Sequence, residues 1–200
     1  MSKYMESCMD FSLLFADDKS FYIEKSNYYT RCVSHGITTV EFIYLRNNTV
    51  YFIEAKRTMP NLQNSDSEQS ISDKLQELVK KIRPSIEMFF SLTVGINSDS
   101  EFPSCFKDID FSKHELIYLI IVSDSEYKRC KYAKEKLQQQ PEIKMLSKIW
   151  KIEVRVMTGE YAIKEGLVKN FVCKLNNTGW KGYGECPRDK CIIQEKALSK

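Results

Sequence analysis

Two strand-like segments, residues 38–46 and 49–58, are separated only by Asn47 and Asn48. Both segments are rich in β-branched and aromatic residues, which favour strands. Asparagine tolerates the positive φ angles of a two-residue turn, so the pattern predicts a β-hairpin. Apolar residues occupy both faces of this hairpin, which is typical of the centre of a sheet that is covered on both sides.

The two-residue turn determines which residues of the hairpin face each other. Arg46 then faces Thr49, and Glu41 faces Glu54. Because side chains alternate along a strand, Lys56 lies on the same face as the two glutamates. Apolar side chains share this face: Ile43, Leu45, Val50 and Phe52. The pattern therefore predicts two carboxylates and a lysine in a largely apolar environment.

Two carboxylates in such a place need a partner. At a separation of about 5 Å they repel by roughly 3 kcal/mol if the effective dielectric is about 20, and burial adds a desolvation cost. A bound cation, Lys56 or a proton shared by the two acids would relieve this repulsion. Mg²⁺ or Mn²⁺ suits the first alternative, because hard divalent cations prefer oxygen ligands. A metal-bound water can attack a phosphodiester, with Lys56 contacting the phosphate or orienting the water.

The rest of the chain predicts a mixed α/β protein with one domain, residues 1–200, whose core is residues 1–160. Residues 161–200 are expected to form an irregular C-terminal extension. A long helix follows the hairpin, and Pro84 is expected to kink or divide it. The expected elements, in order, are a helix within 1–15, a strand or strand pair at 21–31, the hairpin, helix 71–90, strand 116–122, helix 126–140, a helix ending at 150 and strand 152–157.

The run TTVEFIYLRNNTVYFIEAKRT resembles the PD-(D/E)xK nuclease superfamily. That family places an acid on its second core strand and an E-x-K triplet on the third. Glu54, Ala55 and Lys56 match the triplet, and Glu41 takes the position that is usually Asp. The order of elements also resembles the αβββαβ core of the family. The resemblance implies a restriction-endonuclease-like fold, with Mg²⁺ or Mn²⁺ held by Glu41, Glu54 and the carbonyl of Ala55, and with Lys56 assisting catalysis.

Further site residues are implied by the resemblance alone. Many members of the family use another acid from the first helix, and here Glu6 or Asp10 would supply it. Some subfamilies use a glutamine on the helix after the triplet, for which Gln69 and Gln76 are candidates.

Basic residues gather on the helices expected at 71–90 and 126–140. They can line a nucleic-acid groove, although helices also carry such charges as solvated faces. These residues are Lys80, Lys81, Arg83, Lys128, Arg129, Lys131 and Lys134. The net charge of +3 is small, so any basic groove must be local.

The function that these residues predict is a metal-dependent nuclease, an endonuclease acting on DNA or, as the less favoured substrate, on RNA. The alternative is a catalytically inactive protein on the same scaffold that serves as an accessory or nucleic-acid-binding module. Nucleases that cut both strands often pair their subunits, so a homodimer is compatible with this interpretation.

Other patterns in the chain exclude some classes of protein. The first 15 residues match neither a signal peptide nor a membrane span, and the longest apolar stretch, residues 116–122, has the length of a strand. Seven scattered cysteines indicate reduced thiols, so a cytoplasmic protein without a membrane partner is expected. Cys173, Cys186 and Cys191 are interpreted as loop thiols rather than zinc ligands, and His35 and His114 as surface residues.

Overall fold

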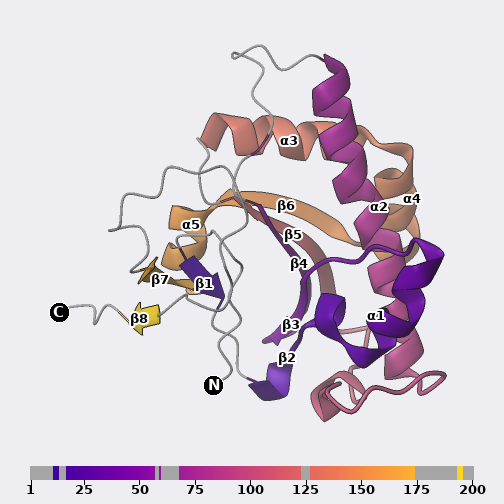
Figure 1. The fold of residues 1–200 in the computed structure, drawn as a ribbon. Coiled ribbons are helices and arrows are strands. Elements are labelled where there is room, and N and C mark those ends of the chain that lie inside the picture. Colours follow the sequence, from indigo (N-terminus) through magenta and orange to yellow (C-terminus); the bar gives the residue numbers. More distant parts are fainter. Residues whose placement is uncertain are drawn as a thin grey trace.

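The computed structural model of the chain describes residues 11–13, 17–56, 59, 68–122, 127–173 and 193–195. A mixed five-stranded sheet lies at the centre with helices on both faces, and a three-stranded sheet lies apart from it (Figure 1). The expected α/β class is therefore confirmed. Helices α2 (Glu68–Thr93), α3 (Tyr127–Gln139) and α4 (Pro141–Trp150) pack on one face of the central sheet, and α5 (Gly159–Lys164) packs on the other.

Five strands make up the central sheet, in the order β2-β3-β4-β5-β6. They are β2 (Ser20–Phe21), β3 (Phe42–Arg46), β4 (Thr49–Lys56), β5 (Glu115–Val122) and β6 (Glu153–Thr158). Strand β3 runs antiparallel to both β2 and β4, whereas β5 runs parallel to β4 and β6 runs parallel to β5. Strand β4 therefore lies in the middle of the sheet, where the antiparallel part meets the parallel part.

The register of the central hairpin is the one that the turn predicts. Arg46 lies opposite Thr49, and the ladder continues to Phe42 opposite Ile53. Asn47 has a positive φ of 54°, which suits the two-residue turn. Apolar clusters cover both faces of the two strands, as expected for a central hairpin.

The segment before β3 is hydrogen-bonded to α2 instead of continuing the strand. The sequence predicts a strand from residue 38, but β3 begins at Phe42. The N–H of Val40 donates to the buried Ser85 hydroxyl of α2 at 2.8 Å, so it does not enter the ladder. One backbone hydrogen bond links this segment to β4, from the N–H of Glu41 to the carbonyl of Ile53 at 3.1 Å, but it is one residue out of the hairpin register, in which Ile53 lies opposite Phe42. The pairing of Glu41 directly opposite Glu54, which the turn predicts, is therefore not part of the ladder. This segment brings Glu41 to the end of the hairpin.

Helix α2 is continuous for 26 residues, although Pro84 lies inside it. The expected division at Pro84 is therefore wrong. The turns around the proline are buried, with Ile82 and Ile86 exposed by 0% and 1%, and this packing outweighs the backbone hydrogen bond that proline cannot make. None of the helices in the described part of the chain combines the length and the hydropathy that crossing a bilayer requires.

The elements predicted for the second half of the chain are confirmed up to residue 158. The strands expected at 116–122 and 152–157 are β5 and β6, and the helices expected at 126–140 and before residue 151 are α3 and α4. The irregular extension expected from residue 161 is wrong in part. This region contains the end of α5, strand β7 (Val168–Cys173) and strand β8 (Ile193–Glu195).

Strands from both ends of the chain form the three-stranded sheet, in the order β1-β7-β8. Strand β1 (Phe11–Leu13) and strand β8 both pair antiparallel with β7. The helix predicted within residues 1–15 is thus wrong at residues 11–13, and residues 1–10 lie outside the described part. Strands β1 and β8 have only three residues each, which is too short for a clear alternating pattern, so the sequence does not reveal this sheet.

The first strand of the central sheet is much shorter than the segment 21–31 predicts. After β2 the chain forms a 3₁₀ turn, η2 (Ile23–Lys25), and helix α1 (Asn27–Cys32). The cause is Ser26, whose hydroxyl caps α1 by accepting the N–H of Tyr29 at 3.0 Å. Tyr28 and Tyr29 pack on the core from this helix. Further 3₁₀ turns are η1 (Asp17–Lys19), η3 (Val33–His35) and η4 (Ser104–Phe106).

Phe89 of α2 lies at the centre of the aromatic part of the core. Its side chain is fully buried, and its ring lies edge-on to those of Phe52 and Phe106, with centroids 5.5 and 5.3 Å away. Phe89→Ala should lower the free energy of unfolding by about 3–5 kcal/mol, because a large cavity replaces the ring. Urea denaturation followed by circular dichroism measures this change.

The matched control for this prediction is Val94→Ala, at a residue that is 64% exposed. This control should change the free energy of unfolding by less than about 0.5 kcal/mol. An equally small change for Phe89→Ala would contradict the central position of this ring in the core.

Candidate functional site

The central hairpin holds Glu41 and Glu54 in the layer between the sheet and α2. Glu54 lies on β4 with 0% exposure, and Glu41 is 5% exposed. The Oε2 atom of Glu41 accepts the backbone N–H of Ala55 at 3.0 Å. This contact holds the Glu41 side chain across the hairpin, against the residue that follows Glu54.

Two lysines neutralise the Glu54 carboxylate. The Nζ atom of Lys56, from the same strand, lies 2.8 Å from Oε1 of Glu54, and Nζ of Lys81, from α2, lies 2.7 Å from the same oxygen. The side chain of Lys56 is 34% exposed and that of Lys81 is 17% exposed. The two lysines therefore lie on the solvent side of the site, while Glu54 is enclosed. The sequence predicts Lys56 at this position, whereas it groups Lys81 with Lys80 and Arg83 in a nucleic-acid groove.

The acids around Lys81 keep it charged. Burial lowers the pKa of its ammonium group, but the charge and hydrogen bond of Glu54 and the charges of Glu24 and Glu41 outweigh burial, and the pKa lies above its usual value. Burial together with the charges of Glu54 and Glu41 raises the pKa of Tyr118 well above its usual value. The Tyr118 hydroxyl therefore stays protonated and donates to a backbone carbonyl of α2 at 2.9 Å.

The helical spacing of α2 contains a signal for the position of Lys81. Leu78 and Ser85 are buried at three residues before and four residues after it, so Lys81 lies on the face of α2 that turns towards the sheet. Its neighbour Lys80 lies off this face and is exposed. The helical spacing therefore distinguishes Lys81, on the inner face of α2, from Lys80, on the exposed face.

Glu24 adds a third carboxylate to the cluster, and the hairpin pattern does not predict it. Glu24 lies on η2, directly after β2, and is partly buried. The pKa of Glu24 lies above its usual value, chiefly because the side chain is partly buried. The charge of Glu54 raises this pKa further, whereas the charges of Lys81 and Lys56 lower it. These interactions join Glu24 to the same electrostatic cluster. A short 3₁₀ turn has no periodic pattern, so the sequence contains no clear signal for this residue.

The second oxygen of Glu54, Oε2, is buried and has no hydrogen-bond partner among the described residues. A buried carboxylate oxygen without a partner is costly, and a cation at this oxygen would remove the cost. The neighbouring donors, the Glu41 carboxylate and the backbone of Ala55, are oxygens of the type that hard divalent cations prefer. Within the described ranges, no three or more His, Cys, Asp or Glu side chains form a group that could hold a metal, so a bound ion would complete its shell with backbone and water oxygens.

The two candidate glutamines make their contacts elsewhere. Gln69 is exposed and its side chain donates to Asp73 at 2.8 Å, one turn further along α2. Gln76 donates to the side chain of Gln140 at 2.9 Å and so connects α2 to the start of α4. Gln69 therefore makes its contact within α2, and Gln76 makes its contact at the junction of α2 with α4.

The basic residues predicted for nucleic-acid binding lie mostly on outer faces of helices. Lys80 and Arg83 are exposed on α2, and Arg83 pairs with Glu87 at 2.8 Å. On α3 the predicted residues are exposed or half-buried: Lys128, Arg129, Lys131 and Lys134. The described part of the chain does not include Glu6, Asp10, Cys186 or Cys191, and it includes only the backbone of Cys173.

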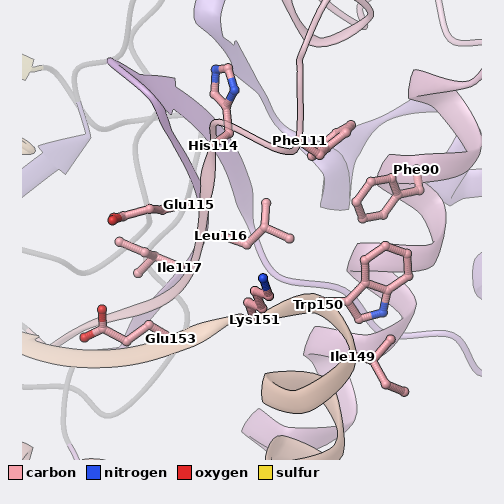
Figure 2. Close-up of a pocket in the computed structure, with 10 residues that line it drawn as sticks. All are labelled: Phe90, Phe111, His114, Glu115, Leu116, Ile117, Ile149, Trp150, Lys151 and Glu153. Atoms are coloured by element: carbon pink, nitrogen blue, oxygen red, sulfur yellow. The ribbon is translucent and has the colours of Figure 1, made fainter.

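A cavity of ≈ 540 Å³ lies at the other end of β5 (Figure 2). His114 lines it, with Nδ1 2.7 Å from the carbonyl of Asp110, while His35 is exposed on η3. In Figure 2, aromatic and acidic side chains lie on opposite sides of β5: Phe90, Phe111 and Trp150 on one, Glu115 and Glu153 on the other. Glu54 lies opposite Ile120, near the far end of β5, so this cavity is separate from the carboxylate cluster.

Comparison of the chain with protein-family models, curated proteins and solved structures gives no match. The interpretation of the site therefore depends on its residues and their geometry. Glu41 and Glu54 offer buried carboxylate oxygens of the type that hard cations prefer, although with Glu24 they do not form a group that could hold a metal among the described residues. The two ammonium groups beside them can bind a phosphate oxygen or stabilise negative charge that develops on it.

Removal of the Glu54 carboxylate should destabilise the protein, because two lysines then lose their shared acceptor. We expect Glu54→Ala to lower the free energy of unfolding by about 1–3 kcal/mol, with most of the loss from Lys81, the more buried lysine. Urea denaturation measures the change. Glu77→Ala, which removes an exposed carboxylate from α2, is the control and should leave the free energy of unfolding unchanged.

A double variant checks that the ion pair causes this loss. If it does, Glu54→Ala combined with Lys81→Met should be more stable than the sum of the two single changes implies. Simple additivity of the two single changes would contradict the pairing.

Proposed function

We propose that the chain is a metal-dependent nuclease of the PD-(D/E)xK type, which hydrolyses phosphodiester bonds of DNA. The observation that carries the proposal is the buried Glu54, whose Oε2 has no hydrogen-bond partner among the described residues. Glu41 adjoins it through Ala55, and Lys56, the lysine of the triplet, lies on the open side. A hard divalent cation at Oε2 would satisfy this oxygen.

The arrangement of the sheet supports the same proposal. Strands β2, β3 and β4 form an antiparallel meander, α2 follows, and β5 then joins β4 in parallel. A restriction-endonuclease-like core has this order, with its E-x-K triplet on the third strand, where Glu54, Ala55 and Lys56 lie. One departure is the position of α1, which lies between the first two strands rather than ahead of them.

When bound, a divalent cation would polarise the scissile phosphate and make a coordinated water more acidic. The residues of the chain would orient the groups around this chemistry. Lys56 and Lys81 hold Oε1 of Glu54 and leave Oε2 for the cation, while the N–H of Ala55 holds Glu41. Lys56, which is one-third exposed, would contact a phosphate oxygen that enters from solvent and offset the negative charge that develops there.

The test is cleavage of single- and double-stranded DNA, and of RNA, in Mg²⁺ or Mn²⁺. Glu54→Gln and Lys56→Ala should each lower the cleavage rate by about 100-fold or more, because each removes a group that acts on the metal or on the phosphate. Addition of EDTA should abolish cleavage by the wild type.

Matched controls are Glu77→Gln and Lys144→Ala, which change exposed residues of α2 and α4. Both should cut at the wild-type rate, since neither contacts the cluster. The enzyme proposal fails if the wild type cuts every substrate no faster than Glu54→Gln does.

The ion pairs themselves favour a second function. Because Lys56 and Lys81 already neutralise Glu54, the hairpin does not require a metal for its charge balance. A nuclease scaffold that binds nucleic acid without cutting it would have this property. This alternative predicts no cleavage and a binding affinity that survives Glu54→Ala. Fluorescence anisotropy of labelled DNA with the wild type and this variant distinguishes the two functions.

A further inference from the structure

The cavity of ≈ 540 Å³ at the start of β5 has the size of a small-molecule site, for which about 300–1,000 Å³ is usual (Figure 2). Two large apolar side chains that line it are open to solvent, since Ile149 is 62% exposed and Trp150 is 39% exposed. The proposed nuclease uses none of the residues that line this cavity. Any ligand of the cavity would therefore bind independently of the carboxylate cluster.

Three aromatic rings form one wall of the cavity. The ring of Phe90 is stacked on the indole of Trp150, with centroids 4.4 Å apart and an angle of 21° between the planes. Phe90 also contacts Phe111, with centroids 4.7 Å apart, and the buried Phe89 lies edge-on to both of these phenylalanines. These contacts hold the rings in place before any ligand binds, which lowers the entropic cost of binding. A planar ring can therefore extend the stack over the exposed part of Trp150.

Lys151 connects α4 to β6 in an unusual backbone conformation. Its φ of 53° and ψ of 30° lie in the left-handed region, which glycine or asparagine usually occupies at the end of a helix. Glycine would adopt this conformation without the steric cost of a Cβ atom, so the turn itself does not favour a lysine. In Figure 2 the ammonium group of Lys151 lies between the aromatic rings and the two glutamates of the cavity. Residues in such conformations are concentrated at ligand sites.

The charges around the cavity favour an anion at Lys151. Among the described residues, Lys151 is the only lysine or arginine that lines the cavity, and it makes no ion pair with any of them. Both carboxylate oxygens of Glu153 already accept from Arg155, at 3.0 and 2.7 Å. Glu115 is exposed, so water and salt screen its charge. An anionic group would therefore give Lys151 the partner that the described part of the chain does not supply.

We propose that this cavity binds a small molecule with a planar aromatic ring and an anionic group, the ring against Trp150 and the anion on the ammonium group of Lys151. Two kinds of molecule have this chemistry. One is an aromatic carboxylate, and the other is a nucleotide, whose base and phosphate supply the ring and the anion. Binding requires neither a metal nor a residue of the carboxylate cluster, so it is independent of the proposed nuclease activity.

The experiment measures the affinity of 2-naphthoate and of adenosine monophosphate by isothermal titration calorimetry in the presence of EDTA. The uncharged counterparts are 2-naphthamide and adenosine, and cyclohexanecarboxylate is the anion without a planar ring. At least one of the two aromatic anions should bind about 10-fold more tightly than its uncharged counterpart and than cyclohexanecarboxylate. The anion that binds more tightly identifies the kind of ligand.

Variants of the two residues that would hold the ligand test their separate roles. Lys151→Gln should weaken binding of the anion by about 10-fold, whereas Lys151→Arg should retain it. Trp150→Ala should weaken binding of the anion and of its uncharged counterpart alike, because the ring stacks in both. Lys144→Gln changes an exposed lysine of α4 that does not line the cavity, and it should bind as the wild type does.

Lys151→Gly separates binding from a role in ending α4. This variant removes the ammonium group and also the steric cost of the left-handed conformation, so it should lose affinity and be at least as stable in urea as the wild type. Loss of stability without loss of affinity would assign Lys151 to the helix end alone and overturn the proposal. The proposal also fails if neither aromatic anion binds at millimolar concentration, if the uncharged counterparts bind as tightly, or if Lys151→Gln retains the wild-type affinity.

Discussion

The rest of the site depends on one interaction, the contact of the buried Glu54 carboxylate with the ammonium groups of Lys56 and Lys81. A carboxylate with 0% exposure in the middle strand of a sheet is strongly destabilising unless it is paired. Lys56 comes from the same strand, but Lys81 comes from α2, so the ion pair also joins the helix to the sheet. The position of α2 over β4 and the charge balance of the site are therefore coupled.

The hairpin could be predicted in detail because its signals are local. Asn47 and Asn48 indicate the length of the turn, and the alternation of side chains assigns the two faces. Together they determine the register, and with it the common face of Glu54 and Lys56. The long helix and the two later strands could be predicted for the same reason, since each has a periodic apolar pattern.

The features that the sequence does not reveal depend on contacts between distant segments. Lys81 follows the period of α2, but only the packing of α2 over β4 brings it to Glu54. Ser26 ends the expected first strand by capping α1, and Glu24 lies in the short turn before that cap. The sheet of β1, β7 and β8 joins segments from both ends of the chain, so neither segment alone predicts it.

Ser85 links the backbone next to Glu41 to the backbone of Lys81, the lysine that pairs with Glu54. Its hydroxyl accepts the N–H of Val40, next to Glu41, and donates to the carbonyl of Lys81, which pairs with Glu54. A rotation of α2 about its axis would displace Lys81 and the backbone ahead of Glu41 together, because a single oxygen holds both. A ligand that rotates this helix, wherever on the surface it binds, would therefore change the contacts of both acids at the same time.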